Sequence, residues 1–235
     1  MKMQARKCLL SYPKLPFLRR QNNTLDCTYL ILDLDDTVYP ISTFPKAVAE
    51  PFFEAIATTN DVLSAQKLEK ALEDSWFIPF YELSEKYQFS DAMVNAALAS
   101  LDNLPPLTIR PFQDYELVRQ LDIPKYLVTS GMSTLQRKKI DALGVREDFD
   151  DVLINDPFQG VRGGKKGLFE QLLQSYQLDP GEGLVIGDNI ESELAAGEAL
   201  GIRTVLIDRV HRYEQVPAWI DFEFDSFEEV LEMIS

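Results

Sequence analysis

The chain has 235 residues, 46% hydrophobic and 26% charged, which is enough apolar material for a sizeable core and too much for a disordered chain. Lys and Arg number 23 against 38 Asp and Glu, and the net charge of −15 argues against a nucleic-acid or anionic-membrane surface. Two cysteines and one histidine are too few for a disulfide scaffold or a Cys/His zinc site, so we expect a cytoplasmic protein. No apolar run approaches the roughly 18 residues of a membrane-spanning helix.

The beginning of the chain differs from the rest in charge. Residues 1–25 contain six basic residues and no acidic one, and Pro13 and Pro16 interrupt the short apolar runs that a secretory signal would need. The composition is basic and acid-free like that of an organellar transit peptide, but it is poor in Ser. We predict that residues 1–27 form a basic N-terminal extension, unstructured or loosely docked.

Short apolar runs alternate with helical patterns through most of the chain. The runs predict strands at 29–32, 126–130, 152–156, 184–188 and 204–208, and the patterns predict helices at 112–121, 133–143, 166–177 and 190–200. Ser133 and Gln136 form a candidate capping box, and 222–234 predicts a short strand and a terminal helix. This alternation is typical of an α/β fold with a doubly wound parallel sheet, Rossmann-like in type.

Residues 45–107 break the alternation and predict an inserted helical cap domain. Helical patterns cover 47–58, 65–86 and 91–101, with no β-branched run between them. Prolines mark both exits, at Pro40 and Pro45 on one side and at Pro105 and Pro106 on the other. We predict a catalytic core made of 28–44 and 108–235, with the cap joined to it by two hinge-like linkers.

Polar residues follow the predicted strands where each strand ends. Asp33 and Asp35 come directly after the first strand, close enough for one to attack while the other moves protons. Thr129, a lysine pair and Asp188 occupy equivalent positions farther along, and such positions converge at one edge of a parallel sheet. Carboxylates, a hydroxyl and lysine without histidine favour Mg²⁺ and an anionic substrate, for which phosphate is the natural group.

These segments resemble the four motifs of the haloacid-dehalogenase-like (HAD) hydrolase superfamily, in order over about residues 29–210. Asp33-Leu34-Asp35-Asp36-Thr37 is similar to the first motif and Thr129 to the second. Lys165 or Lys166 is similar to the third motif, and Gly187-Asp188 with the acids after it to the fourth.

The resemblance implies that Asp33 is a nucleophile that forms an aspartyl-phosphate and that Asp35 is the acid/base. It implies that Mg²⁺ is bound by the Asp33 carboxylate, the Asp35 backbone carbonyl and Asp188. Thr129 and Ser130, with the lysine of the third motif, would bind the phosphate oxygens.

Two departures from the family pattern leave choices open. Gly163-Gly164-Lys165-Lys166-Gly167 replaces the usual third motif, so both lysines are candidates for phosphate binding, and we favour Lys166 as the catalytic one. The usual second Asp of the fourth motif is replaced by Glu193. We expect Asn189, Glu191 and Glu193 to support the metal or the lysine, with no choice made between the two glutamates.

Together these observations predict a Mg²⁺-dependent phosphomonoester hydrolase for a small phosphorylated metabolite, monomeric or homodimeric. Val38-Tyr39-Pro40 after the first motif is similar to pyrimidine 5′-nucleotidase-like members, which favours nucleoside monophosphates. Alternatives are a phosphomutase of the same fold, a haloacid dehalogenase and a non-catalytic phosphate-ligand-binding protein. Asp35 favours a phosphatase over a dehalogenase. We interpret the aromatic run 76–81 as cap core rather than as a base-stacking platform.

Overall fold

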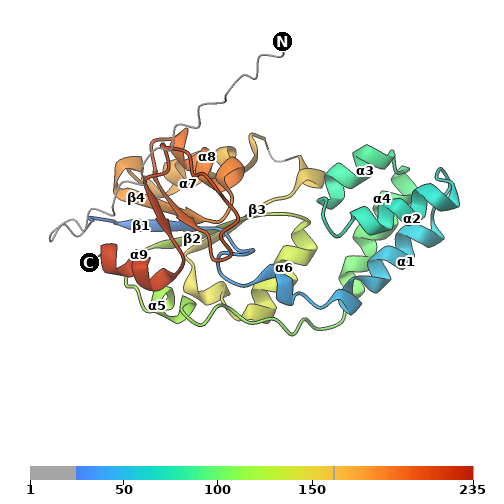
Figure 1. Ribbon diagram of the computed structural model, residues 1–235, viewed down its shortest axis with the longest axis horizontal. Helices are drawn as coiled ribbons and strands as arrows, with labels where there is room; N and C mark the ends of the chain where they lie inside the picture. The colour runs from blue at the N-terminus through green and yellow to red at the C-terminus, as the bar shows by residue number, and fades with distance from the viewer. Residues whose placement is uncertain (1–24, 161, 235) are drawn as a thin grey trace, which may run out of the picture.

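The computed structural model describes residues 25–160 and 162–234 of the chain (Figure 1). The predicted basic extension therefore lies outside the described residues except for its last three. Of these, Leu25 donates its backbone N–H to the carbonyl of Met233 at 2.8 Å, and the carbonyl of Asp26 accepts from Arg203 at 2.6 Å. The end of the segment is thus attached to the core.

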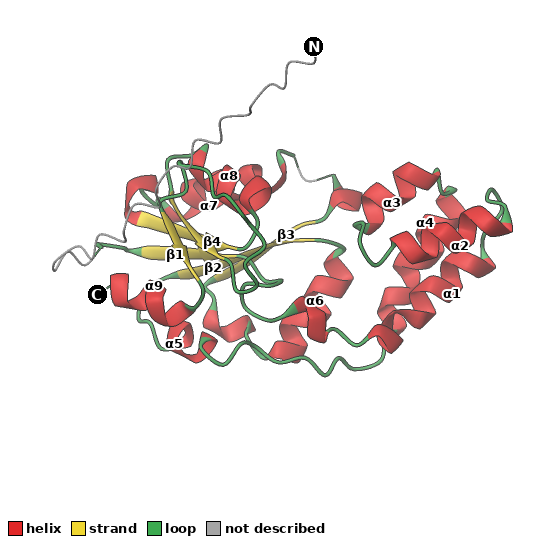
Figure 2. Ribbon diagram, viewed as in Figure 1, coloured by secondary structure: helices red, strands yellow, loops and turns green. Residues whose placement is uncertain are grey.

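A parallel sheet in the order β3-β2-β1-β4-β5-β6 forms the centre of the core (Figure 2). The strands are β1 (Tyr29–Leu32), β2 (Lys125–Ser130), β3 (Asp151–Asn155), β4 (Gly183–Gly187), β5 (Arg203–Ile207) and β6 (Phe222–Phe224). The chain moves outward from β1 to β3 on one side and from β4 to β6 on the other. The predicted Rossmann-like α/β fold is confirmed, and β1 lies beside the point where the strand order reverses.

Helices cover both faces of the sheet, because alternate residues of each strand point to opposite sides. Leu30 and Leu32 face α5 (Tyr115–Arg119), α6 (Ser133–Leu143) and α9 (Phe227–Met233), which lie below the sheet in Figure 1. Tyr29 and Ile31 face α7 (Gly164–Tyr176), the π-helical turn Ile190–Leu194 and α8 (Ala195–Glu198) above it. Burial on both faces explains why the strands are continuously apolar.

The segment between β1 and α5 forms a helical layer to one side of the sheet (Figure 1). It contains α1 (Glu50–Thr58), α2 (Ala65–Asp74), α3 (Phe80–Tyr87) and α4 (Asp91–Ser100), packed around their own hydrophobic cluster. The prediction of one helix over 65–86 was wrong, since α2 ends at Asp74 and α3 begins after Pro79. Proline has no backbone N–H and cannot continue a helix, so the segment 75–79 becomes a separate loop.

The capping box predicted for the helix at 133–143 was also wrong. The backbone N–H of Ser133 donates to the buried carboxylate of Asp156 at 2.8 Å, and no side chain of the helix itself caps its start. Because Asp156 satisfies this end of the helix, the side chain of Gln136 is free to turn toward the ends of the strands.

The remaining regular structure consists of short 3₁₀ turns. They lie at Ile41–Thr43, Lys46–Ala49, Leu101–Asn103, Arg146–Asp148, Pro157–Gln159 and Pro180–Glu182. Within residues 25–160 and 162–234, no helix combines the length and the apolar character needed to cross a membrane.

Candidate active site

Several predicted site residues lie at the carboxyl edge of the sheet. Asp33 follows β1, Thr129 lies in the last part of β2, and Asp188 follows β4. Strands β2 and β4 are the two neighbours of β1 in the sheet. Parallel strands bring these positions together, and the crevice at the reversal of strand order is where open α/β sheets bind ligands. The backbone N–H of Asp33 donates to the carbonyl of Ile186 at 3.0 Å, which joins the first and fourth motifs directly.

A buried lysine joins two carboxylates in this crevice. The ammonium of Lys165, in the first turn of α7, donates to Asp33 Oδ1 at 2.6 Å and to Glu193 Oε2 at 2.7 Å. The other carboxylate oxygen of Glu193 accepts the backbone N–H of Asn189 at 2.7 Å. Glu193 lies so close over Gly187 that a Cβ at that position would collide with its side chain and displace it from these contacts.

The same crevice has more negative than positive charge. Carboxylate oxygens of Asp33, Asp188 and Glu193 lie within 4.8 Å of one another. Burial raises the pKa of Asp33 to about 8, opposed by Lys165 and reinforced by Glu193. Burial and the Glu193 charge likewise raise the pKa of Asp188 to about 6. Oxygen ligands with surplus negative charge fit a divalent cation such as Mg²⁺, which would favour the ionised carboxylates.

Asp35 is held by a different set of side chains. Lys139 donates to its two carboxylate oxygens at 2.7 and 3.0 Å, Tyr39 at 2.6 Å, and the amide of Gln136 at 3.0 Å. Burial acts to raise the pKa of Asp35, but the Lys139 charge and these hydrogen bonds outweigh it and hold the pKa below its ordinary value. The same amide of Gln136 contacts Thr129 Oγ1 at 2.6 Å. Asp35 and Thr129 are therefore linked in one polar network.

Other predicted residues lie outside these contacts. Lys166, favoured from the sequence, points away from Asp33: its side chain is 50% exposed and pairs with Glu170 at 3.3 Å. Glu191 is exposed, and Asn189 accepts the Glu191 backbone N–H at 3.0 Å instead of touching the lysine. Ser130 is exposed at the end of β2 and accepts from Asn155 at 3.1 Å. Of the two lysines and the two glutamates left open by the sequence, Lys165 and Glu193 are the ones buried in the crevice with Asp33.

Four further residues of the site were not identified from the sequence. Gln136 and Lys139 lie on the buried stripe of α6 with Ile140 and Leu143. Polar residues on an otherwise apolar stripe of a helix could have indicated in the sequence that these two side chains have buried polar partners. Tyr39 was noted only as part of a family-like segment. Arg212, after β5, donates to Asp188 at 2.7 Å and to Asp36 at 3.2 Å, and no pattern in the sequence indicates this contact.

The chain is similar to known proteins in sequence and in fold. The family model for haloacid dehalogenase-like hydrolases matches residues 28–201. The chain is 23% identical over 226 residues to the glyceraldehyde 3-phosphate phosphatase of Methanopyrus kandleri, covering 87% of this chain and 96% of that one. It is 28% identical over 109 residues to the pyrimidine 5′-nucleotidase YjjG of Escherichia coli, covering 45% and 48%.

Among solved structures, the HAD-hydrolase YfnB of Bacillus subtilis, bound to magnesium, aligns with a TM-score of 0.57 at 17% identity. The alignment covers 89% of this chain and 99% of that one. The family model, the relatives and the fold all point to the same family. The chain belongs to the haloacid dehalogenase-like hydrolase family and is a phosphoric monoester hydrolase of its phosphatase branch.

Proposed function

We propose that this protein is a Mg²⁺-dependent phosphatase that hydrolyses a small phosphorylated metabolite through an aspartyl-phosphate at Asp33. The observation that carries this proposal is the buried Lys165, which contacts Asp33 and Glu193 while Asp188 completes a carboxylate cluster. A carboxylate nucleophile beside a cation and further acids is the arrangement that transfer of a phosphoryl group requires.

Asp33 is the attacking group. Lys165 holds its Oδ1, so Oδ2 is the atom that would form the bond to phosphorus while the bond from phosphorus to the ester oxygen breaks. Lys165 also favours the ionised carboxylate against the effect of burial. Hydrolysis of the aspartyl-phosphate then restores the carboxylate and releases inorganic phosphate.

The residues suited to hold Mg²⁺ are Asp33 and Asp188 through their carboxylates and Asp35 through its backbone carbonyl. When bound, Mg²⁺ would screen the repulsion between the Asp33 carboxylate and the phosphoryl oxygens. Glu193 serves a different purpose, because both of its oxygens already accept hydrogen bonds, from Lys165 and from the backbone of Asn189. It holds Lys165 in place beside Asp33.

Asp35 moves the protons. In the first step it gives a proton to the ester oxygen of the leaving group, and in the second it takes one from the water that attacks the aspartyl-phosphate. The contacts with Lys139, Gln136 and Tyr39 favour the carboxylate form, which is the form needed to accept the proton from water. For the first step Asp35 must carry a proton and loosen its contact with Lys139.

We further propose that residues 45–107 act as a cap domain on a core formed by 28–44 and 108–235. Closure of such a layer over the crevice would exclude bulk water and complete the substrate site. Nucleoside monophosphates remain the favoured substrates, on the similarity of Val38-Tyr39-Pro40 to nucleotidase-like sequences and of the chain to a pyrimidine 5′-nucleotidase.

The test is release of inorganic phosphate from a panel of nucleotides and sugar phosphates, with Mg²⁺ or with EDTA, by wild type and Asp33→Asn. We expect release that requires Mg²⁺ and is lost in the variant. Release that survives EDTA and Asp33→Asn would refute the mechanism. Transfer of phosphate between substrate positions with little free phosphate would indicate a mutase instead.

A further inference from the structure

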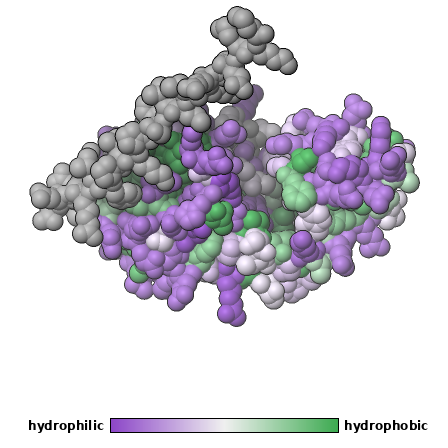
Figure 3. Space-filling view, viewed as in Figure 1, coloured by the Kyte–Doolittle hydropathy of each residue, from purple (hydrophilic) through white to green (hydrophobic). Residues whose placement is uncertain are grey.

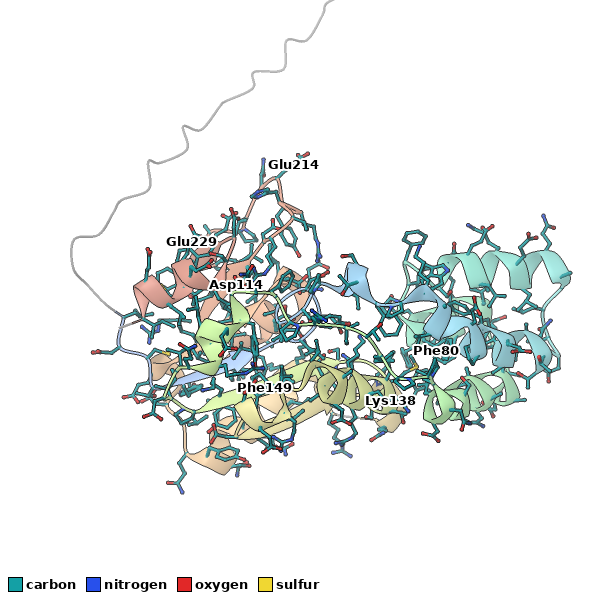
Figure 4. All side chains as sticks on the ribbon, turned by 90° about the horizontal axis from the view of Figure 1, so that it is seen from below. Phe80, Asp114, Lys138, Phe149, Glu214 and Glu229 are labelled. Carbon is teal, nitrogen blue, oxygen red and sulfur yellow. The ribbon has the colours of Figure 1, made fainter. Side chains whose placement is uncertain are left out.

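A largely apolar pocket lies between the helical layer and the sheet, with a cavity volume of about 440 Å³. Phe44 of the linker, Phe53 of α1 and Phe80 of α3 form one side, and Leu135 of α6 contributes from the core. Figure 4 places Phe80 on the side of the helical layer nearest the core, and Figure 3 shows hydrophobic residues along this junction. The volume is within the range of about 300–1,000 Å³ typical of small-molecule sites.

One end of this pocket belongs to the catalytic machinery. Asp35 and Lys139 line it, and Asp35 is the group that protonates the ester oxygen in the proposed reaction. The atoms of the substrate beyond that oxygen must therefore begin at Asp35. The pocket begins at the same carboxylate, so it is placed to receive the leaving group rather than the phosphoryl group.

We infer that the substrate is a phosphomonoester whose leaving group is uncharged and carries an aromatic ring, which this pocket binds. The inference rests on the proposed phosphatase function and adds the chemical class of its substrate. Ring walls fit this occupant: Phe53 lies 5.0 Å from Trp76 and Phe52 lies 4.7 Å from Phe80, centroid to centroid, both pairs edge to face. Such walls are stiff and offer further edges and faces to an incoming ring.

The loop between α2 and α3 supplies the rim of the pocket. Phe77 is 88% exposed and Trp76 is 43% exposed, and both line the pocket. The interpretation of the aromatic run 76–81 as cap core was wrong for Trp76, Phe77 and Tyr81, which are exposed. A phenylalanine this exposed gains little from folding, whereas contact with a bound ring would remove part of its surface from water.

The lining disfavours small polar substrates. Apart from the indole N–H of Trp76, its polar side chains, within the described part of the chain, are those of Asp35, Ser75 and Lys139. Lys139 is already paired with Asp35. The ammonium and carboxylate of phosphoserine, or the hydroxyls of a triose phosphate, would lose water there without matching partners. An aromatic ring would instead gain from burial against the same walls.

The experiment compares benzyl phosphate with glycerol 1-phosphate and phosphoserine, in the presence of Mg²⁺. All three leave as aliphatic alcohols, so differences in kcat/KM report on binding of the leaving group rather than on its intrinsic reactivity. We expect benzyl phosphate to be favoured by roughly tenfold or more. Loss of one aromatic contact in Phe77→Ala should raise KM for benzyl phosphate about threefold to tenfold and leave the values for glycerol 1-phosphate unchanged.

Val62→Ala is the matched control. Val62 is an exposed apolar residue of the same helical layer, between α1 and α2, and lies outside the pocket lining. Since Phe77 and Val62 are both exposed, neither substitution threatens the fold. Equal effects of the two substitutions on KM, or preference for the polar esters, would overturn the inference while leaving the phosphatase function intact.

A binding measurement separates the inference from the proposed function. Benzylphosphonate and ethylphosphonate cannot be hydrolysed, and calorimetry of each with wild type and Phe77→Ala requires no turnover. We expect benzylphosphonate to bind more tightly, with the difference reduced in Phe77→Ala. If benzylphosphonate binds more tightly but no ester is hydrolysed, the proposed phosphatase function is refuted and the aromatic binding pocket is supported. Equal affinities for the two phosphonates would refute the inference that the pocket binds an aromatic leaving group.

Discussion

Two neighbouring lysines provide a direct test of the active-site geometry. The Lys165 ammonium lies between two buried carboxylates, at 2.6 Å from Asp33 and 2.7 Å from Glu193, while Lys166 is half-exposed and pairs with Glu170. We compare Lys165→Met with Lys166→Met, two substitutions of the same size at adjacent positions of one helix.

Lys165→Met leaves two buried carboxylates without their cation, which costs about 3–5 kcal/mol when one partner of a buried pair is removed. Loss of this stabilising charge beside the nucleophile should lower kcat about 10²–10³-fold. Lys166→Met removes an exposed pair four residues apart on a helix, worth no more than about 0.5 kcal/mol. Its phosphatase activity should equal that of wild type.

The sign of the pH dependence is an additional check. Without Lys165, the pKa of Asp33 rises further above the unfolded value of about 3.9, since its nearest cation is gone. A carboxyl whose pKa is raised in the folded state lowers stability increasingly as pH rises from the unfolded pKa to the folded one. With Lys165 present the pKa of Asp33 is already about 8, so at pH 7 this carboxyl keeps its proton in wild type and in the variant. The stability deficit of Lys165→Met should therefore be larger at about pH 9.5, where only wild-type Asp33 ionises, than at about pH 7.

Urea unfolding at both pH values and phosphate release from the best substrate of the panel measure these effects. Lys165→Met with wild-type stability and activity, or Lys166→Met as the inactive variant, would refute the assignment of the lysine. If Lys165→Met is inactive but its unfolding midpoint is unchanged, the predicted loss of stability is refuted, while the assignment of Lys165 to the site stands.

Further predictions concern other parts of the molecule. Lys139→Met should lower kcat roughly 10–100-fold with little change in KM, because it acts on the proton-moving Asp35; a change confined to KM would contradict this role. Asp114→Ala removes the carboxylate that accepts from Arg209 at 2.8 and 3.0 Å and from the first backbone N–H of α9 at 2.8 Å. Urea unfolding should show a loss of about 2–4 kcal/mol with activity per folded molecule retained, and an unchanged midpoint would count against it. Mg²⁺ should raise the unfolding free energy more at pH 8 than at pH 5, because protons compete for carboxyls such as Asp188, with its pKa of about 6; equal increments would exclude these acids as ligands.

Local patterns in the sequence were enough to predict the sheet and the position of the candidate site along the chain. The run Tyr29–Leu32 is apolar at every position because both of its faces are buried, and this burial is visible as a pattern without any knowledge of its partners. Asp33 and Asp188 were found because the positions just after parallel strands converge whatever the details of the loops.

Which of several similar residues faces the site depends on contacts between distant segments of the folded chain. Lys165 and Lys166 are adjacent, and residues one apart on a helix point about 100° apart, so the choice depends on how the helix lies against the sheet. That orientation is set by contacts between residues far apart in the chain: Asp33 and Lys165 are separated by 132 residues. No local pattern contains this information.

Gln136 illustrates the same limit from the opposite direction. Its spacing from Ser133 suits a cap for its own helix, but Asp156 from beyond β3 occupies that end, and Gln136 contacts Asp35 and Thr129 instead. Periodicity and turn chemistry are properties of short segments, and they determine where strands and helices form. Which polar group satisfies which partner is a competition among segments that only the folded chain brings together.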